Sequence, residues 1–269
     1  MPPADVATGE YFVGVAVDPA TKQSRATLKS DGSEITYEGL GTMSKSRNNG
    51  VDPNSLTEKY GADTARLFMM FTAPPEQTLE WSDAGVDGSY RFLRRLWAFA
   101  QQWQEVIREE SGRRAGAFSG YAFPAGMATA SPRHAELRRE VHAVLRQATF
   151  DMQRNQFNTV ASAAMKLLNA LDDFASDDSA GDRAVLCEGV SLLLRLLYPV
   201  CPHITDQLWR ELGYSSAHAS LLDAPWPVVD EAALVQDEIE LMLQVNGKLR
   251  GSILVPAQAS KEEIEALAR

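Results

Sequence analysis

Apolar residues between positions 90 and 212 recur every three or four residues, which is the period of an amphipathic α-helix. The segment from Val190 to Tyr198 is apolar on almost every face, so it is expected at the centre of a bundle. Pro199 should end this helix, and Pro202 can occupy the first turn of the next one. Three further apolar stripes predict helices beside it, at residues 93–107, 137–148 and 157–171.

Both ends of the chain follow the alternating period of β-strands instead. Near the N-terminus, short extended segments separated by turn residues are expected at Tyr11–Val17, Arg25–Leu28 and Glu34–Tyr37. Near the C-terminus, alternation up to Asn246-Gly247 predicts a tight hairpin, and Ser260 to Glu263 form a capping box that begins a helix. The predicted fold class is mainly α: a helical bundle with a small N-terminal β insertion, a C-terminal β-hairpin and the start of a helix.

The pattern divides the chain into a β module, a loop with two short helices, the bundle and the start of a C-terminal α/β domain, at residues 1–40, 41–80, 81–235 and 236–269. In the second part, Ser55 to Glu58 form a candidate capping box for a helix that ends near Gly61. Asp63 is expected to cap the next helix, and Arg66 to be a buried or paired charge. A hairpin with one short helix cannot bury a core, so the C-terminal domain is expected to be truncated.

Composition is typical of a globular protein. The chain has 269 residues, and 45% of them are hydrophobic, which is ample for a packed core. No apolar run approaches the roughly 20 residues that cross a bilayer, and the first residues do not form a secretory signal, so a cytoplasmic protein without a membrane partner is expected. Cys187 and Cys201 lie in apolar helical surroundings typical of buried thiols. Together with His203 they lack the paired spacing of a zinc site, so we expect no bound metal.

Charge is distributed unevenly along the chain. The net charge is −10, which by itself disfavours a nucleic-acid partner, yet residues 91–146 hold ten arginines against five glutamates. Residues 166–240 hold four basic and fourteen acidic side chains. One half of the molecule can therefore face a polyanion, although ordinary solvated helix surfaces explain the same arginines equally well.

Two other residue types in the bundle have simple structural interpretations. His134 and His142 have no partner that the sequence makes evident, so they are expected at the surface. Aromatic residues at helical spacing usually belong to the core rather than stack on nucleotides, and this interpretation applies to Trp97, Trp103 and Trp209.

The segment from Gly41 to Gly50 carries the clearest candidate chemistry. Flanking glycines allow such a loop to move, the hydroxyls of Ser44 and Ser46 can bind phosphate oxygens, and Lys45 can neutralise charge that develops on a triphosphate. A Ser-Lys-Ser tripeptide is nevertheless common in surface loops. The loop alone leaves two interpretations open: a segment that closes over ATP, and an ordinary surface turn.

The residues around the loop favour the first interpretation through a family resemblance. The loop and the run Tyr-Gly-Ala-Asp-Thr-Ala-Arg from Tyr60 to Arg66 resemble the Lys-Met-Ser-Lys-Ser region of class I aminoacyl-tRNA synthetases. Other segments resemble leucyl-tRNA synthetases in the same order, namely Glu80-Trp81-Ser82, Arg91–Trp97, Pro202–Thr205, Trp226-Pro227 and Val245–Lys248. Asn48-Asn49-Gly50 and the β module before the loop are similar to the bacterial leucyl type rather than to its valyl and isoleucyl relatives.

The resemblance implies roles for the loop. Lys45 would be the catalytic, ATP-binding lysine, which stabilises the charge passing to pyrophosphate when the carboxylate of leucine attacks the α-phosphorus. Ser44 and Ser46 would assist in binding ATP, which acts with Mg²⁺. Thr42, before Met43, stands where the family has its first lysine, and this departure puts that lysine's contact in doubt.

The resemblance also implies partners and limits. The bundle would be the anticodon-binding domain of a cytoplasmic monomer, with its arginines on the backbone of tRNA(Leu). The family's His-x-Gly-His turn, leucine pocket and editing domain are absent from this sequence, so the segment alone is expected to be inactive, and ligation of leucine to tRNA is expected of the complete enzyme. Two alternatives stay open: a non-catalytic tRNA-binding helical module derived from a synthetase, and a helical scaffold that binds an acidic protein.

Overall fold

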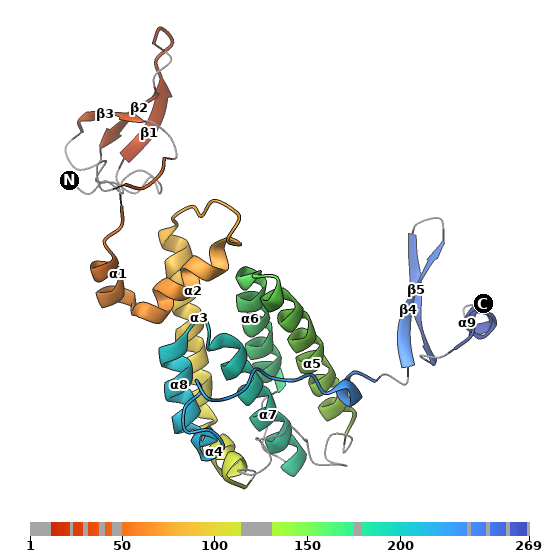
Figure 1. Ribbon diagram of the computed structural model, residues 1–269. Helices are drawn as coiled ribbons and strands as arrows, with labels where there is room; N and C mark the ends of the chain where they lie inside the picture. The colour runs from red at the N-terminus through yellow and green to blue at the C-terminus, as the bar shows by residue number, and fades with distance from the viewer. Residues whose placement is uncertain are drawn as a thin grey trace.

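The structure is a computed structural model that describes residues 12–21, 24–28, 32–37, 41–44, 50–113, 131–174, 179–235, 238–245, 248–256 and 259–267. It has three parts (Figure 1): a β module near the N-terminus, a helical bundle with two short helices beside it, and a hairpin with one helix near the C-terminus. The predicted fold class is confirmed, because most described residues are helical and the described strands lie near the two ends of the chain.

Six helices of the described chain form the bundle: α3 (Asp83–Gln102), α4 (Gln104–Arg113), α5 (Pro132–Gln153), α6 (Phe157–Phe174), α7 (Ala180–Leu197) and α8 (Pro202–Glu211). The apolar stripe at 93–107 is interrupted at Trp103, where α3 ends and α4 begins. Helices α5, α6 and α7 pack against one another. Pro202 occupies the first turn of α8, as predicted, and Gly213 follows this helix in the left-handed conformation, with φ of 82°.

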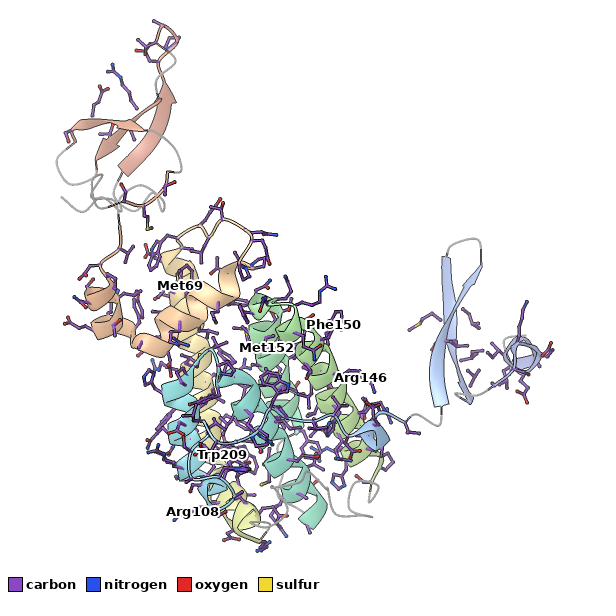
Figure 2. The ribbon with its side chains drawn as sticks, in the orientation of Figure 1. Met69, Arg108, Arg146, Phe150, Met152 and Trp209 are labelled. Carbon is purple, nitrogen blue, oxygen red and sulfur yellow. The ribbon has the colours of Figure 1, made fainter. Side chains whose placement is uncertain are left out.

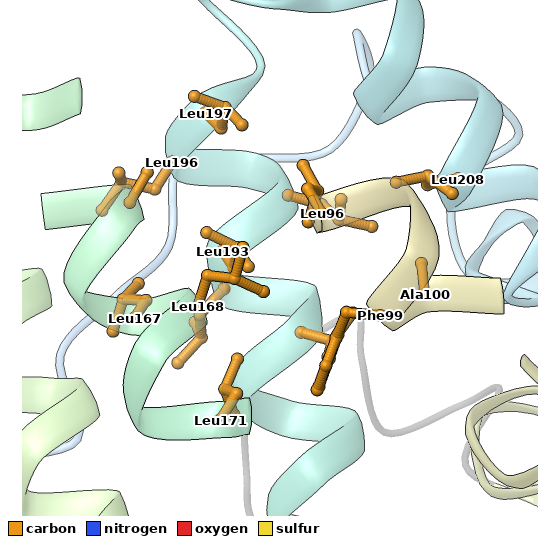
Figure 3. Close-up of a cluster of buried hydrophobic side chains, with 14 of the residues drawn as sticks. Leu96, Phe99, Ala100, Leu167, Leu168, Leu171, Leu193, Leu196, Leu197 and Leu208 are labelled. Carbon is orange, nitrogen blue, oxygen red and sulfur yellow. The ribbon is translucent and has the colours of Figure 1, made fainter. Parts of the chain in front are cut away.

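Helix α7 lies at the centre of the bundle, as its apolar sequence predicts. Figure 3 shows its leucines packed between α6 and α3, with labelled residues Leu193, Leu196, Leu197, Leu167, Leu168, Leu171, Leu96, Phe99 and Ala100. Helices α6 and α7 approach closely at Gly189, where an added Cβ would lie 2.4 Å from Cδ2 of Leu171. Each fully buried leucine stabilises such a core by about 1.5–3 kcal/mol. The leucines of α7 therefore contribute strongly to the packing of the neighbouring helices against it.

The β-structure at both ends is antiparallel. Near the N-terminus, β1 (Phe12–Val17), β2 (Ser24–Leu28) and β3 (Glu34–Tyr37) form one sheet in that order. Near the C-terminus, β4 (Glu238–Val245) pairs with β5 (Lys248–Pro256), and α9 (Lys261–Leu267) follows. The predicted hairpin is confirmed, while its turn at Asn246-Gly247 lies outside the described residues. The capping box at Ser260 is also confirmed, because Glu263 and Ser260 exchange backbone and side-chain hydrogen bonds.

Two short helices, α1 (Pro53–Tyr60) and α2 (Ala62–Thr72), connect the loop to the bundle. The predicted capping box at Ser55 is wrong, because α1 begins two residues earlier, at Pro53. Asp52 is its N-cap and accepts hydrogen bonds from the N–H groups of Asn54 and Ser55, at 3.3 and 3.1 Å. A capping aspartate followed by proline at the first helical position is a strong helix start, and it overrides the weaker signal at Ser55.

Candidate functional site

The structure describes the first part of the predicted ATP-closing loop. Thr42 and Met43 are exposed, and Ser44 is half-buried. Lys45 and Ser46 lie outside the described residues. The ATP-binding roles of Ser44, Lys45 and Ser46 therefore stay predictions, and the geometry that can be followed begins at Gly50.

The chain after the loop enters a firmly capped helix. Hydrogen bonds from the backbone N–H groups of Ser55 and Asn54 hold the pKa of Asp52 below its ordinary value. The carboxylate of Asp52 consequently remains ionised at neutral pH and complements the partial positive charge at the N-terminus of α1. The chain after the loop thus enters α1 at a capped start, on a helix without a buried side chain.

Asp63, in the first turn of α2, caps a distant helix. The N-cap of its own helix is Gly61, which provides no side-chain hydrogen bond, so the prediction that Asp63 caps its own helix is wrong. Its Oδ2 accepts from the backbone N–H of Ile204 at 2.7 Å, and its Oδ1 lies 2.7 Å from Nδ1 of His203. Cys201, the N-cap of α8, has no capping side-chain bond, and the carboxylate of Asp63 takes over that function.

Arg66 holds the other side of the same turn. Its Nε donates to the carbonyl oxygen of Val200 and its Nη2 to that of Pro199, both at 2.9 Å. These carbonyls lie between α7 and α8, where they have no partner within either helix ladder. The prediction that Arg66 is a buried or paired charge is therefore wrong, because its side chain is exposed and bonds two neutral carbonyl groups. Together, Asp63 and Arg66 brace α2 against the start of α8 and the turn that precedes it.

Helix α5 carries four basic side chains one turn apart, at His134, Arg138, His142 and Arg146. We call these residues the α5 row. Each contacts at least one acidic side chain of α7 or of the segment before β4, drawn from Asp182, Glu188, Asp230 and Glu231. Each member of the row therefore has an acidic partner within the fold: Arg138 is buried with its partners, whereas Arg146 and Glu231 form an exposed pair.

Arg138 is the most deeply buried member of the α5 row that carries a permanent charge, at 4% exposure. Its Nε and Nη2 donate to the two carboxylate oxygens of Glu188 at 2.7 and 2.9 Å, and Nη2 also reaches Asp230 Oδ2 at 2.7 Å. Burial would raise the pKa of Glu188, but the hydrogen bonds from Arg138 and His142 outweigh it and hold this pKa below its ordinary value. The cluster therefore stays ionised at neutral pH.

The prediction that His134 and His142 lie at the surface is wrong. They are 5% and 2% exposed, because they share the inward face of α5 with Leu137, Val141 and Leu145. His134 Nε2 lies 2.7 Å from Asp182 Oδ1, and His142 Nε2 lies 3.2 Å from Glu188 Oε1. The backbone N–H of Asp230 donates to Nδ1 of His142 at 3.1 Å, which assigns the hydrogen of a neutral His142 to Nε2. The spacing of three and four from the apolar positions was the signal that could have revealed this burial.

Exposed cations lie on α3, α4 and α6 as well as at Arg133 and Arg146 of α5. Arg91, Arg94, Arg108 and Lys166 are all exposed. Arg94 packs its guanidinium over the ring of Tyr90, 5.9 Å from the centroid. Figure 2 shows Arg108 near the end of the bundle formed by α4, and Arg146 on α5 at the side from which the C-terminal segment leaves.

Comparisons with known proteins found one matching family model and similar proteins over most of the chain. Residues 134–266 match the family described as the anticodon-binding domain of tRNA ligase. The chain is 59% identical over 263 residues to a leucine–tRNA ligase of Leptothrix cholodnii, and 63% identical over 238 residues to that of Variovorax paradoxus. These alignments cover 96% and 88% of the chain. The chain belongs to the leucyl-tRNA synthetase family. It spans 28% and 26% of these two synthetases.

A solved synthetase structure has a similar fold. It is the ternary complex of Agrobacterium radiobacter K84 agnB2 LeuRS with tRNA and LeuAMS. The similarity has a TM-score of 0.68 at 26% sequence identity, and it covers 83% of this synthetase segment and 26% of that chain.

The tryptophans of the synthetase segment differ in burial. Trp209 is 1% exposed, with Nε1 donating to the carbonyl of His218 at 2.9 Å, and Trp103 is partly buried against the core, so these two core predictions are confirmed. Trp97 is 37% exposed, so its prediction is wrong. It lies on α3 beside the buried stripe of Leu93, Leu96 and Ala100 rather than within it.

Both cysteines are buried, as predicted, with Sγ of Cys187 and Cys201 lying 3.9 and 3.7 Å from the carbonyl oxygens of Ile107 and Asp63. Burial raises the pKa of the Cys201 thiol well above its ordinary value. Across the described ranges, no group of three or more His, Cys, Asp or Glu is placed to hold a metal ion. No helix in the described part of the synthetase segment has the length and apolar character of a membrane span.

Proposed function

We propose that this chain is the segment of a leucine–tRNA ligase that supplies the ATP-closing loop and the tRNA-binding bundle. The complete enzyme activates leucine with ATP and transfers it to tRNA(Leu). The observation that carries this proposal is the 55–63% identity to leucine–tRNA ligases over nearly the whole chain, loop and bundle included. The division at residues 40, 80 and 235 into β module, loop region, bundle and C-terminal domain belongs to the same proposal.

In this proposal, Lys45 is the catalytic residue. Its ammonium stabilises the negative charge that passes to pyrophosphate when the carboxylate of leucine attacks the α-phosphorus of ATP, and Ser44 and Ser46 bind phosphate oxygens. ATP enters with Mg²⁺ as a substrate. The capped start of α1 at Asp52 and the brace at Asp63 support this role, since a loop that closes over ATP needs a fixed point to close against.

In the bundle, we propose that exposed cations of α3 contact the phosphate backbone of the tRNA. Arg91 and Arg94 lie on the solvent side of α3, and no acidic side chain of the described chain forms an ion pair with either. Arg138 of the α5 row is left out because it is buried against Glu188 and Asp230, and Arg146 is left out because its charge is paired with Glu231. Phosphate contacts of this kind position a nucleic acid without reading its sequence. The complete enzyme is expected to be a cytoplasmic monomer.

The test is aminoacylation of tRNA(Leu) by the complete protein, with leucine, isoleucine and valine offered separately. Charging with leucine alone is the expected result. Charging with another amino acid, or none with any of the three, would refute the proposal.

A second function, a non-catalytic tRNA-binding module, is favoured by one observation: Thr42 replaces the first lysine of the loop signature. The two functions differ in ATP chemistry. A non-catalytic module would bind tRNA in a salt-dependent manner and would not exchange pyrophosphate into ATP.

A further inference from the structure

Cations and aromatic rings alternate along a surface that connects α1 with α3. Nζ of Lys59 lies over the ring of Tyr60, 4.7 Å from its centroid. The ring of Tyr60 meets that of Tyr90 edge to face, with the centroids 5.6 Å apart. The guanidinium of Arg94 lies over Tyr90 in turn, and Trp97 follows one turn later on the same side of α3. We call these residues, from Lys59 to Trp97, the α1–α3 strip.

The strip offers positive charge to solvent. Lys59 and Arg94 are exposed, and neither forms an ion pair within the part of the chain that the structure describes. Asp83 and Asp87 interact electrostatically with Lys59, so they weaken the positive field at that end of the strip. The guanidinium of Arg94 donates no hydrogen bond to the described residues, so its N–H groups can contact a phosphate. Arg94 is therefore the better phosphate ligand of the two.

Trp97 is the open ring of the strip. It is 37% exposed, and among the described residues its ring meets no other ring or cation and its Nε1–H has no acceptor. The Nε1–H groups of Trp81, Trp209 and Trp226, by contrast, all donate to acceptors in the protein. Packing beside the apolar stripe of α3 accounts for the buried part of the indole, but not for the part that stays in water.

We propose that Trp97 stacks on an unpaired nucleobase of the tRNA while Arg94 contacts a neighbouring phosphate. The proposal rests on the proposed function and deepens it, because it takes tRNA as the ligand and α3 as the contact helix. Residues three apart on a helix are neighbours, so one nucleotide can meet both side chains. Proteins bind single-stranded nucleic acids with this combination, in which the cation neutralises the backbone and the ring stacks on a base.

Stacking gives the α3 surface a preference that phosphate contacts lack. Bases within an RNA duplex are already stacked on their neighbours, whereas unpaired bases can turn out and stack on an aromatic side chain. Loss of a stacking ring should weaken binding without changing the number of counterions released. Loss of a phosphate-binding cation should also reduce the slope of log K against log salt by about one. Salt dependence therefore separates the role of Trp97 from that of Arg94.

Phe150 provides a matched control for Trp97. This aromatic residue is 52% exposed near the C-terminal end of α5 (Figure 2), and the guanidinium of Arg154 lies 5.2 Å from its ring centroid. Phe150 is therefore an exposed ring beside an arginine, as Trp97 is, but it lies outside the strip and a cation already covers it. Replacing either ring by leucine removes an aromatic face and keeps an apolar side chain.

The experiment uses the complete enzyme with Trp97→Leu, Trp97→Phe, Arg94→Ala and Phe150→Leu. Filter binding measures Kd across a salt series for tRNA(Leu) and for a blunt RNA duplex, which offers phosphates without unpaired bases. For Trp97→Leu we expect a Kd for tRNA raised about five- to fiftyfold, with the salt slope and duplex binding unchanged. Trp97→Phe keeps a ring and should raise this Kd only about two- to fivefold. Arg94→Ala should reduce the salt slope for both ligands, and Phe150→Leu should match the wild type.

Several outcomes overturn the proposal. An unchanged Kd in Trp97→Leu shows that the ring does not stack on the tRNA, and equal losses for tRNA and duplex show that it does not select unpaired bases. A lower free energy of unfolding in urea with unchanged tRNA binding shows that another part of the complete enzyme covers Trp97. If Trp97→Leu does not fold, Trp97→Phe decides by the same criteria.

Failure of the proposed function gives a different result. A wild-type enzyme that binds tRNA but does not charge it with leucine refutes the proposed function, while the Trp97 variants still report on stacking. A wild-type enzyme that does not bind tRNA refutes both.

Discussion

The carboxylate of Asp63 accepts a hydrogen bond from the backbone N–H of Ile204, 141 residues later in the chain, at 2.7 Å. Asp63 belongs to α2, the second helix after the predicted ATP-closing loop, and Ile204 belongs to the first turn of α8. The bond therefore joins the region of proposed catalysis to the region of proposed tRNA binding. Arg66 strengthens the same connection through the carbonyls of Pro199 and Val200.

Replacing Asp63 by alanine should destabilise the protein by about 1–2 kcal/mol, because α8 loses its cap and the part-buried N–H of Ile204 loses its partner. Urea unfolding followed by far-ultraviolet circular dichroism measures the change. His203→Ala is the control, since the side chain of His203 is 73% exposed and should contribute less than about 0.5 kcal/mol. Equal effects of the two substitutions would show that the Asp63–Ile204 bond is not the stabilising contact.

Two glycine-to-alanine substitutions should have opposite effects. Gly189→Ala places a methyl group 2.4 Å from Cδ2 of Leu171 in the tightly packed core, so we expect a loss of about 1–3 kcal/mol. Gly88→Ala, within α3, has only Nη2 of Arg91 nearby, at 3.9 Å, and should stabilise the helix by about 0.5–1 kcal/mol. Thermal unfolding of both variants checks the pair. A stabilised Gly189→Ala variant would contradict the close approach of α6 and α7.

Acid should weaken the fold through the carboxylates that bind the α5 row. The pKa of Glu188 lies below its ordinary value of 4.5 in the folded protein, so the unfolded chain binds a proton more readily as pH falls. The stabilisation is therefore complete above about pH 4.5 and is lost as pH falls through the lower pKa of the folded state. Glu188→Gln should lower the free energy of unfolding by about 3 kcal/mol at neutral pH and make it depend less on pH in the acid range. Urea unfolding between pH 3 and pH 7 measures both effects.

The exposed Glu136 of α5 provides the comparison for Glu188 of α7. Glu136→Gln should leave both the free energy of unfolding at neutral pH and its acid dependence unchanged. An acid dependence that is the same in wild type and Glu188→Gln would exclude Glu188 as its source.

The salt dependence of tRNA binding should distinguish arginines without an acidic partner from Arg146, which is paired with Glu231. Arg91→Ala and Arg94→Ala in the complete enzyme should each weaken tRNA binding and reduce the slope of log K against log salt by about one. Arg146→Ala, which removes an arginine paired with Glu231, should leave the slope unchanged. Filter binding across a salt series measures these slopes, and a reduced slope for Arg146→Ala alone would place the tRNA on α5 instead of α3.

Much of the fold could be predicted because it depends on local patterns. The apolar character of Val190 to Tyr198 identified the central helix, and the alternation before Asn246 identified the hairpin. The start of α1 was placed wrongly because two local signals competed, and the one at Asp52 and Pro53 was stronger.

The contacts that organise the candidate site could not be predicted from the sequence. Asp63 and Ile204, or Arg138 and Asp230, are far apart in the chain, and no local rule pairs them. Burial of His134 and His142 could have been inferred from helical spacing, but their partners on α7 could not. Motif resemblance identified the loop, whose central residues Lys45 and Ser46 lie outside the part of the chain that the structure describes.

The most direct test of the account is leucine-dependent ATP–pyrophosphate exchange by the complete enzyme, comparing wild type, Lys45→Ala and the control Lys59→Ala on exposed α1. We predict exchange with leucine but not with isoleucine or valine, a loss of about 10²–10³-fold in Lys45→Ala, and wild-type activity in Lys59→Ala. Undiminished exchange in Lys45→Ala would contradict the role of the loop. No leucine-dependent exchange in the wild-type enzyme would contradict the account as a whole.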